Sequence, residues 1–161
     1  MIYCIDSHTF IWAVKKQADV HDQHMIEEAR ILMEWIDQSN HQIMVPTIVL
    51  AECLIREPEI NHAPIIEAAN RHFIVADFDS RCSLKYGQLL RLDKWQTAKA
   101  VSKTNDIRRE KMKLDHMIIA TALVHGANGV FSCDEGIKVF ANNIISVYPP
   151  SIVSKEGIML G

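Results

Sequence analysis

Short apolar runs recur along the chain, separated by stretches whose apolar residues have helical spacing, and this alternation constrains the fold more than any other feature. A run of consecutive apolar residues is typical of a strand that is buried on both faces of a parallel sheet. The runs predict strands at residues 2–5, 43–45, 73–75, 130–132 and 144–148.

The intervening segments predict helices. Between residues 21 and 38 the apolar residues recur with helical spacing, which predicts an amphipathic helix; they are Met25, Ile26, Ala29, Leu32, Met33 and Ile36. Strands that alternate with helices predict an α/β domain, here a three-layer α/β/α sandwich with a mainly parallel sheet of about five strands. We assign this domain to residues 1–150 and a C-terminal tail to residues 151–161. The other helices are expected over residues 9–14, 47–55, 65–72, 79–92, 115–125 and 135–141.

Composition excludes several classes of protein. Apolar residues make up 48% and charged residues 23% of the chain, as in an ordinary globular domain. No apolar stretch approaches the ~20 residues of a membrane span, and residues 1–6 lack the features of a signal peptide. We therefore expect no membrane association and a cytoplasmic location. The four cysteines are scattered without a CxxC pair, and GxxxxGK[ST], GxGxxG and GxSxG sequences are absent, which argues against zinc ribbons, nucleotide-binding loops and serine hydrolases.

Basic residues are concentrated in one segment. Residues 91–113 carry a net charge of +5, which leaves −8 for the rest of a chain whose net charge is −3. Such a segment is typical of a protein that binds a polyanion, although a solvated basic helix face has the same composition.

Four carboxylates are placed where a parallel sheet would bring them together. Asp6 follows the first expected strand, Glu52 lies in the helix after the second, and Asp134 follows the fourth. Asp115 begins the helix that leads into the fourth strand. Open α/β sheets bind ligands beyond the carboxyl ends of their strands. Each residue also has a simpler interpretation: a strand-end turn for Asp6, helix capping for Asp115 and Asp134, and an exposed helix stripe for Glu52.

A shared cation would explain all four carboxylates at once. Without one they would repel each other, and some would become protonated. Mg²⁺ and Mn²⁺ prefer oxygen ligands, and such ions can activate water to attack a phosphodiester. The expected chemistry is therefore metal-assisted phosphodiester hydrolysis, with the basic segment holding the polyanion.

These residues resemble the motifs of the PIN-domain ribonucleases, and in particular of the VapC-type toxins of bacterial toxin–antitoxin systems. The matching segments lie in the family's order and span most of the chain. They are residues 5–8, 45–52, 114–123 and 130–134.

The resemblance implies an endoribonuclease of α/β/α fold that acts on RNA. It implies that Asp6, Glu52, Asp115 and Asp134 are catalytic and bind Mg²⁺ or Mn²⁺, with Ser132 helping to orient a ligand. It also implies a protein antitoxin as partner and a homodimer. The apolar face of residues 25–36 is either the interface of such a dimer or part of the core. Within the basic segment, the candidate contacts to RNA phosphates are Lys103, Arg108, Arg109, Lys111 and Lys113.

Other interpretations remain open from the sequence. The first alternative is a non-catalytic PIN-like module that binds RNA or protein. The second is a receiver domain, for which Asp77 and Asp79 follow the third strand, although no convincing Lys follows the fifth. His116 is expected either to face the carboxylates or to pack as an ordinary helix residue, and Trp95 either to stack on a base or to be partly buried.

Overall fold

The protein is described by a computed structural model that covers residues 1–92, 106–154 and 157–158, with side chains described for residues 1–92 and 111–153. Trp95 and Lys103 lie outside these residues, and the side chains of Arg108 and Arg109 lie outside the description.

Five strands form one sheet in which every neighbouring pair is parallel, in the order β3-β2-β1-β4-β5. This confirms the expected sheet. At its centre β1 pairs with β4, with Ile5 opposite Phe131. The strands are β1 (Ile2–Ile5), β2 (Gln42–Pro46), β3 (Ile74–Ala76), β4 (Gly129–Phe131) and β5 (Val147–Tyr148).

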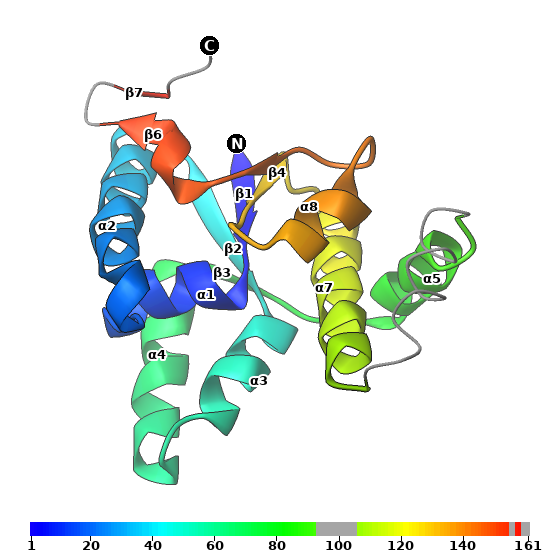
Figure 1. Ribbon diagram of the computed structural model, residues 1–161, viewed down its shortest axis with the longest axis horizontal. Helices are drawn as coiled ribbons and strands as arrows, with labels where there is room; N and C mark the ends of the chain where they lie inside the picture. The colour runs from blue at the N-terminus through cyan, green and yellow to red at the C-terminus, as the bar shows by residue number, and fades with distance from the viewer. Residues whose placement is uncertain (93–105, 155–156, 159–161) are drawn as a thin grey trace.

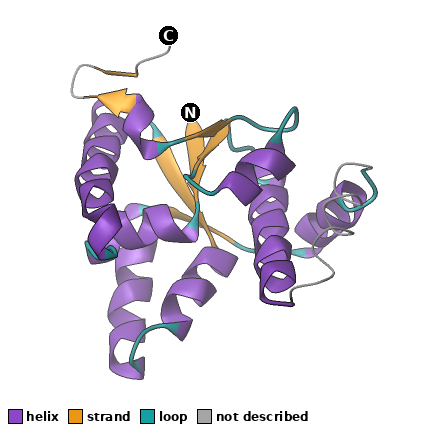
Figure 2. Ribbon diagram, viewed as in Figure 1, coloured by secondary structure: helices purple, strands orange, loops and turns teal. Residues whose placement is uncertain are grey.

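Helices cover both faces of the sheet and confirm the three-layer architecture (Figures 1 and 2). In Figure 1 the helices α1, α2 and α4 lie on one side of the strands, and α7 and α8 lie on the other, with α5 outside α7. Their bounds are α1 (Ser7–Phe10), α2 (Gln23–Gln38), α3 (Thr47–Ile55), α4 (His62–His72), α5 (Ser80–Leu89), α7 (Asp106–Val124) and α8 (Glu135–Ala141). A π-helical turn, Ile11–Lys15, extends α1, and short 3₁₀ turns occur at Val20–Asp22, Glu59–Asn61 and Pro150–Ile152.

The beginning of α7 differs from the sequence-based expectation. The helix was predicted to start at Asp115, but it already starts at Asp106. The residues in between are mostly Arg, Lys, Glu and Met, which are good helix formers, so the basic segment continues into the helix. Asp115 therefore lies within α7, and its interpretation as a helix cap is wrong.

The apolar face of α2 is part of the core. Met25, Ala29, Leu32 and Ile36 are all buried within the single chain. The interpretation of this face as core is therefore confirmed, and these four side chains are not available to a dimer interface. The C-terminal segment packs on the same helix through Pro150–Ile152 and β6 (Val153–Ser154), which pairs antiparallel with β7 (Gly157–Ile158).

Within the part of the chain that the structure describes, no helix combines the length and the apolar character needed to cross a membrane.

The sheet topology brings distant segments to one edge. The chain leaves β1 into α1, leaves β2 into α3, and reaches α8 soon after β4. Because all five strands are parallel, these exits lie at the same edge, and β1 and β4 are adjacent where the strand order reverses. This is the position at which open α/β sheets form their binding crevices.

Candidate active site

Four carboxylates line one small cavity of about 30 Å³ at this edge: Asp6, Glu52, Asp115 and Asp134. They come from four separate segments of the chain, and the topology of the sheet brings them together. The cavity is large enough for about one water-sized particle. Its other lining residues are Ser7, His8, Lys111, Ile118 and Ile137.

Asp6 is the most deeply buried of the four carboxylates, with 2% of its surface exposed. It is the N-cap of α1, where its Oδ1 accepts a hydrogen bond of 2.8 Å from the Thr9 N–H. Its Oδ2 accepts a hydrogen bond of 2.5 Å from the Ser132 hydroxyl. Both oxygens are therefore fixed by donors from different elements, which holds the carboxylate in one orientation.

Ser132 connects two of the carboxylates. Its hydroxyl donates to Asp6 and accepts a hydrogen bond of 2.9 Å from the Asp134 N–H. The side chain is fully buried. A single hydroxyl thereby sets the position of the Asp6 carboxylate relative to the backbone that carries Asp134.

Asp134 is the N-cap of α8, so the capping interpretation is confirmed for this residue. Its Oδ1 accepts hydrogen bonds from the N–H groups of Gly136 at 2.7 Å and Ile137 at 3.3 Å. Its Oδ2 pairs with the Lys111 ammonium at 2.5 Å. Burial acts to raise the pKa of Asp134, but Lys111 and the two N–H groups outweigh it and hold the pKa below its ordinary value.

Glu52 lies on α3 and is half-buried rather than on an exposed stripe. It receives a short hydrogen bond from the Ser7 hydroxyl, which belongs to the first turn of α1. The contact joins α3 to the end of β1 and turns the carboxylate of Glu52 toward the cavity.

Asp115 has the most perturbed acidity of the group. It is 7% exposed, and burial raises its pKa to about 7, with further contributions from the negative charges of Asp134, Glu52 and Asp6. The Lys111 ammonium, one helical turn earlier on α7, acts in the opposite direction. Near neutral pH this carboxyl group is therefore divided between its protonated and ionised forms, and a nearby cation would favour the ionised form.

Gly136 is a site residue that the sequence interpretation missed. A Cβ atom at this position would lie 2.9 Å from Asp134 Oδ1 and 3.1 Å from Asp115 Oδ2. The missing side chain therefore lets the start of α8 approach α7 closely enough for both carboxylates to face the cavity. In the sequence, the Asp-Glu-Gly segment after β4 could have indicated the role of this glycine.

The sequence matches the family model "PIN domain" over residues 3–143. The chain belongs to the PIN-domain family. The match covers most of the chain and includes every residue that lines the carboxylate cavity, which confirms the family resemblance inferred from the motifs.

A solved structure also has the fold of this PIN domain. It is VapBC2 from Rickettsia felis bound to a DNA fragment from their promoter, with 17% sequence identity and a TM-score of 0.56. The similarity covers 92% of this chain and 98% of that one, and at this identity it supports the shared fold. No curated protein sequence matches the chain.

The donor set of this PIN domain fits a hard divalent cation. The four carboxylates offer only oxygen atoms, which Mg²⁺ and Mn²⁺ prefer, and burial raises the pKa of Asp115, so a cation in this cavity would favour its ionised form. The carboxylates are nevertheless spread around the cavity: they are not among the described groups whose ligand atoms all lie within 4.8 Å of one another. The Lys111 ammonium lines the same cavity and pairs with Asp134.

Of the predicted phosphate-binding residues with described side chains, Lys111 lies in the cavity and Lys113 is half-buried outside it. His116 does not face the carboxylates. It is buried with its ring 4.3 Å from the Phe140 ring, and burial lowers its pKa to about 4. The cleft-facing interpretation of His116 is therefore wrong, and the packing interpretation is confirmed.

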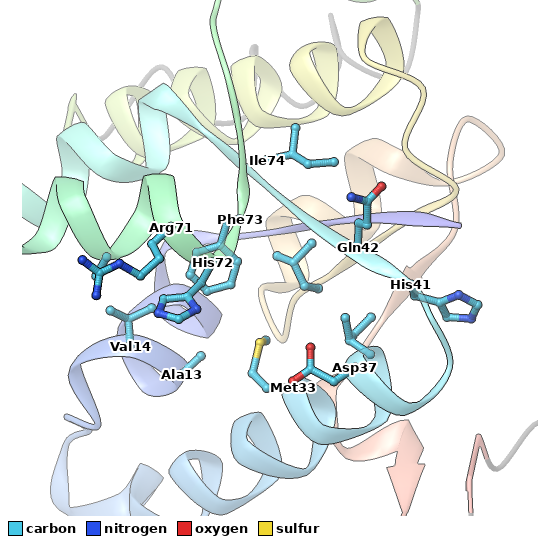
Figure 3. A pocket seen from close by; sticks show the side chains of 13 residues that line it. Ala13, Val14, Met33, Asp37, His41, Gln42, Arg71, His72, Phe73 and Ile74 are labelled. Carbon is cyan, nitrogen blue, oxygen red and sulfur yellow. The ribbon is translucent and has the colours of Figure 1, made fainter.

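Two larger cavities, of about 570 and 710 Å³, contain none of the four carboxylates. The first lies between α2 and α4 and is shown in Figure 3, where Met33 and Asp37 of α2 face Gln42 and Ile74, the first residues of β2 and β3. It therefore lies at the amino ends of the strands, opposite to the carboxylate site. Cavity volume alone therefore does not identify the carboxylate site.

A second cluster of potential ligands lies away from the cavity, where α5 begins and α7 ends. Asp79, Cys82 and His125 each offer a ligand atom, and these atoms all lie within 4.8 Å of one another. No local motif predicts this group, since Cys82 lacks a CxxC partner and His125 is more than 40 residues further along the chain.

Proposed function

We propose that this PIN domain is an endoribonuclease that depends on Mg²⁺ or Mn²⁺. The observation that carries the proposal is the convergence of Asp6, Glu52, Asp115 and Asp134 on one small cavity. Asp6 and Asp115 are almost fully buried. Burying a carboxylate costs free energy of folding unless hydrogen bonds or a positive charge compensate for it. Perturbed acidic groups that gather in a cleft are typical of catalytic sites.

Asp6, Asp115 and Asp134 would hold the divalent ion, and Glu52 would complete the ligand set from α3. When bound, the ion supplies the charge that makes water nucleophilic near neutral pH and stabilises the phosphate during hydrolysis. The protein contributes orientation: Ser132 holds Asp6, and Ser7 holds Glu52. Such supporting hydrogen bonds keep ligands in position before the ion arrives.

Lys111 would bind the substrate. Its ammonium pairs with Asp134 and its side chain is half-exposed, so it would be free to contact a phosphate if a divalent ion neutralised Asp134. The rest of the basic segment, including Lys103, Arg108, Arg109 and Lys113, would neutralise neighbouring phosphates of an RNA strand.

A protein antitoxin is the partner that we propose. The motif resemblance is to VapC-type toxins, and the structural neighbour is a VapBC2 complex bound to promoter DNA. On this proposal the chain is the toxin of such a pair. A homodimer and a cytoplasmic location belong to the same proposal.

The test is cleavage of structured and unstructured RNA by the purified chain in MnCl₂, MgCl₂ or EDTA. We expect cleavage with either metal salt and none in EDTA. Asp6→Asn removes a buried ligand and should reduce cleavage by ~10²- to 10³-fold, the range for loss of one group that stabilises charge in the transition state. Asp37→Asn is the matched control, since Asp37 is exposed on α2 and away from the cavity, and it should cleave at the parental rate.

Equal cleavage by Asp6→Asn and the parent would contradict the assignment. A thermal melt separates the remaining alternative, a non-catalytic binding module. A cation that binds the folded state raises the melting temperature, so Mn²⁺ should stabilise the parent but not Asp6→Asn. RNA binding without a Mn²⁺-dependent shift and without cleavage would favour the binding module.

A further inference from the structure

We propose that Asp79, Cys82 and His125 form a second metal site, specific for Zn²⁺, which clamps the start of α5 to the end of α7. The inference does not depend on the proposed nuclease activity, because none of these residues lines the carboxylate cavity.

The three side chains converge from two helices. Asp79 caps α5, Cys82 lies in its first turn, and His125 follows the last residue of α7. Cys82 is fully buried, whereas Asp79 and His125 are partly exposed. The group therefore has a protected sulfur and an open side through which an ion can enter.

A backbone carbonyl orients two of the ligands. The Asp77 carbonyl oxygen lies 3.0 Å from His125 Nε2 and 3.6 Å from Cys82 Sγ. Since a carbonyl only accepts hydrogen bonds, Nε2 carries the proton and Nδ1 keeps the lone pair. A histidine that donates one ring N–H to a backbone carbonyl is the usual arrangement around metal-binding imidazoles.

The third ligand is held in one orientation. Asp79 Oδ1 accepts hydrogen bonds from the N–H groups of Arg81 at 2.9 Å and Cys82 at 3.0 Å. Its Oδ2 accepts a hydrogen bond of 2.8 Å from the exposed guanidinium of Arg81. These hydrogen bonds keep the carboxylate beside Cys82 before an ion arrives.

The donor atoms select the metal. Sulfur, nitrogen and oxygen in one three-residue set suit Zn²⁺, which takes Cys, His and carboxylate ligands and can hold water as the fourth. Mg²⁺ and Mn²⁺ prefer the all-oxygen set of the carboxylate cavity. Zinc binding must release the thiol proton of Cys82, whose pKa burial raises.

The test is a titration of the reduced, metal-free full chain with CoCl₂, followed by displacement with ZnCl₂. Cobalt bound to a thiolate gives a near-ultraviolet charge-transfer band, which carboxylate ligands do not give. We expect the band to saturate at one Co²⁺ per chain and to disappear when Zn²⁺ is added. Zn²⁺ should also raise the melting temperature of the chain.

Two variants and two controls decide the outcome. Cys82→Ser and His125→Gln should each weaken cobalt binding at least tenfold, and Cys82→Ser should abolish the band; His125→Gln changes a partly exposed side chain and guards against misfolding of the buried variant. Cys133→Ser, at another cysteine that is partly buried, and Asp6→Asn should keep the band. No band in the parent, or a band that persists in Cys82→Ser or is lost in Asp6→Asn, would overturn the proposal.

Discussion

The pKa of an acidic residue is shifted in opposite directions in the carboxylate cavity and in the Asp79–Cys82–His125 cluster. In the cavity, burial and neighbouring negative charge raise the pKa of Asp115 to about 7. In the cluster, backbone N–H groups and Arg81 lower the pKa of Asp79. The folded chain thus destabilises the charge of one carboxylate and stabilises that of the other.

The difference follows from what surrounds each group. Asp79 caps a helix and faces partial positive charge, so its ionised form is satisfied without a metal. Asp115 lies inside α7 among other acids, and Lys111 offsets only part of their charge. A carboxylate whose charge lowers the stability of the folded chain is typical of a functional site. A carboxylate whose charge is stabilised by its neighbours also contributes to the stability of the fold.

Two matched substitutions in the metal-free protein should change the free energy of unfolding most, and with opposite signs. At pH 8, Asp115→Asn should stabilise the chain by roughly 1–4 kcal/mol, at ~1.36 kcal/mol per pKa unit, while Asp79→Asn should destabilise it. The folded pKa of Asp115 lies above its ordinary value of 3.8, so its ionised form opposes folding. Urea unfolding in EDTA measures both changes.

The pH dependence gives the control. The stabilisation by Asp115→Asn should shrink as pH falls from 7 toward 4, because Asp115 then takes up its proton in the folded state. The destabilisation by Asp79→Asn should persist over that range and fade only at lower pH, since the pKa of Asp79 is lowered. Changes of the same sign at pH 8 would remove the distinction between the two sites.

A second comparison separates the sites by function. Ser132→Ala deletes the hydroxyl that orients Asp6 and accepts the Asp134 N–H. We expect RNA cleavage to fall 10- to 100-fold, as is usual for groups that position metal ligands, with an unchanged cobalt band at Cys82. Ser7→Ala removes the corresponding donor to the half-buried Glu52 and should cost less. Full activity of Ser132→Ala would show that Asp6 needs no such support.

Removing the basic residue that each site already contains should have a more modest effect. Lys111 pairs with Asp134, and Arg81 pairs with Asp79. Lys111→Gln should tighten Mn²⁺ binding about three- to tenfold while weakening RNA binding, and Arg81→Gln should tighten Co²⁺ binding to a similar extent, because each removes a competing cation. Calorimetric titrations give both dissociation constants. Lys138→Gln, whose exposed partner is Glu135, is the control and should change neither.

The sheet and its carboxylates could be predicted from sequence because the signals are local. Apolar runs mark buried strands, and parallel strands end at a common edge, so Asp6, Glu52 and Asp134 had to approach one another. The start of α7 was missed because basic residues continue a helix as readily as they form a loop. The direction of side chains on a helix could not be predicted from the sequence either. His116 packs in the core, although its neighbour Asp115 lines the cavity.

Local apolar patterns and motifs were sufficient to predict the α/β/α architecture, the PIN-domain family and the four candidate acids. The folded chain was needed to show that Lys111 pairs with one of those acids, that Gly136 makes room for two of them, and that His125 lies near Cys82. Strands and helices are predictable because the spacing of apolar residues over a few positions marks them. Contacts between helices depend instead on how whole faces pack, which no local stretch of residues encodes.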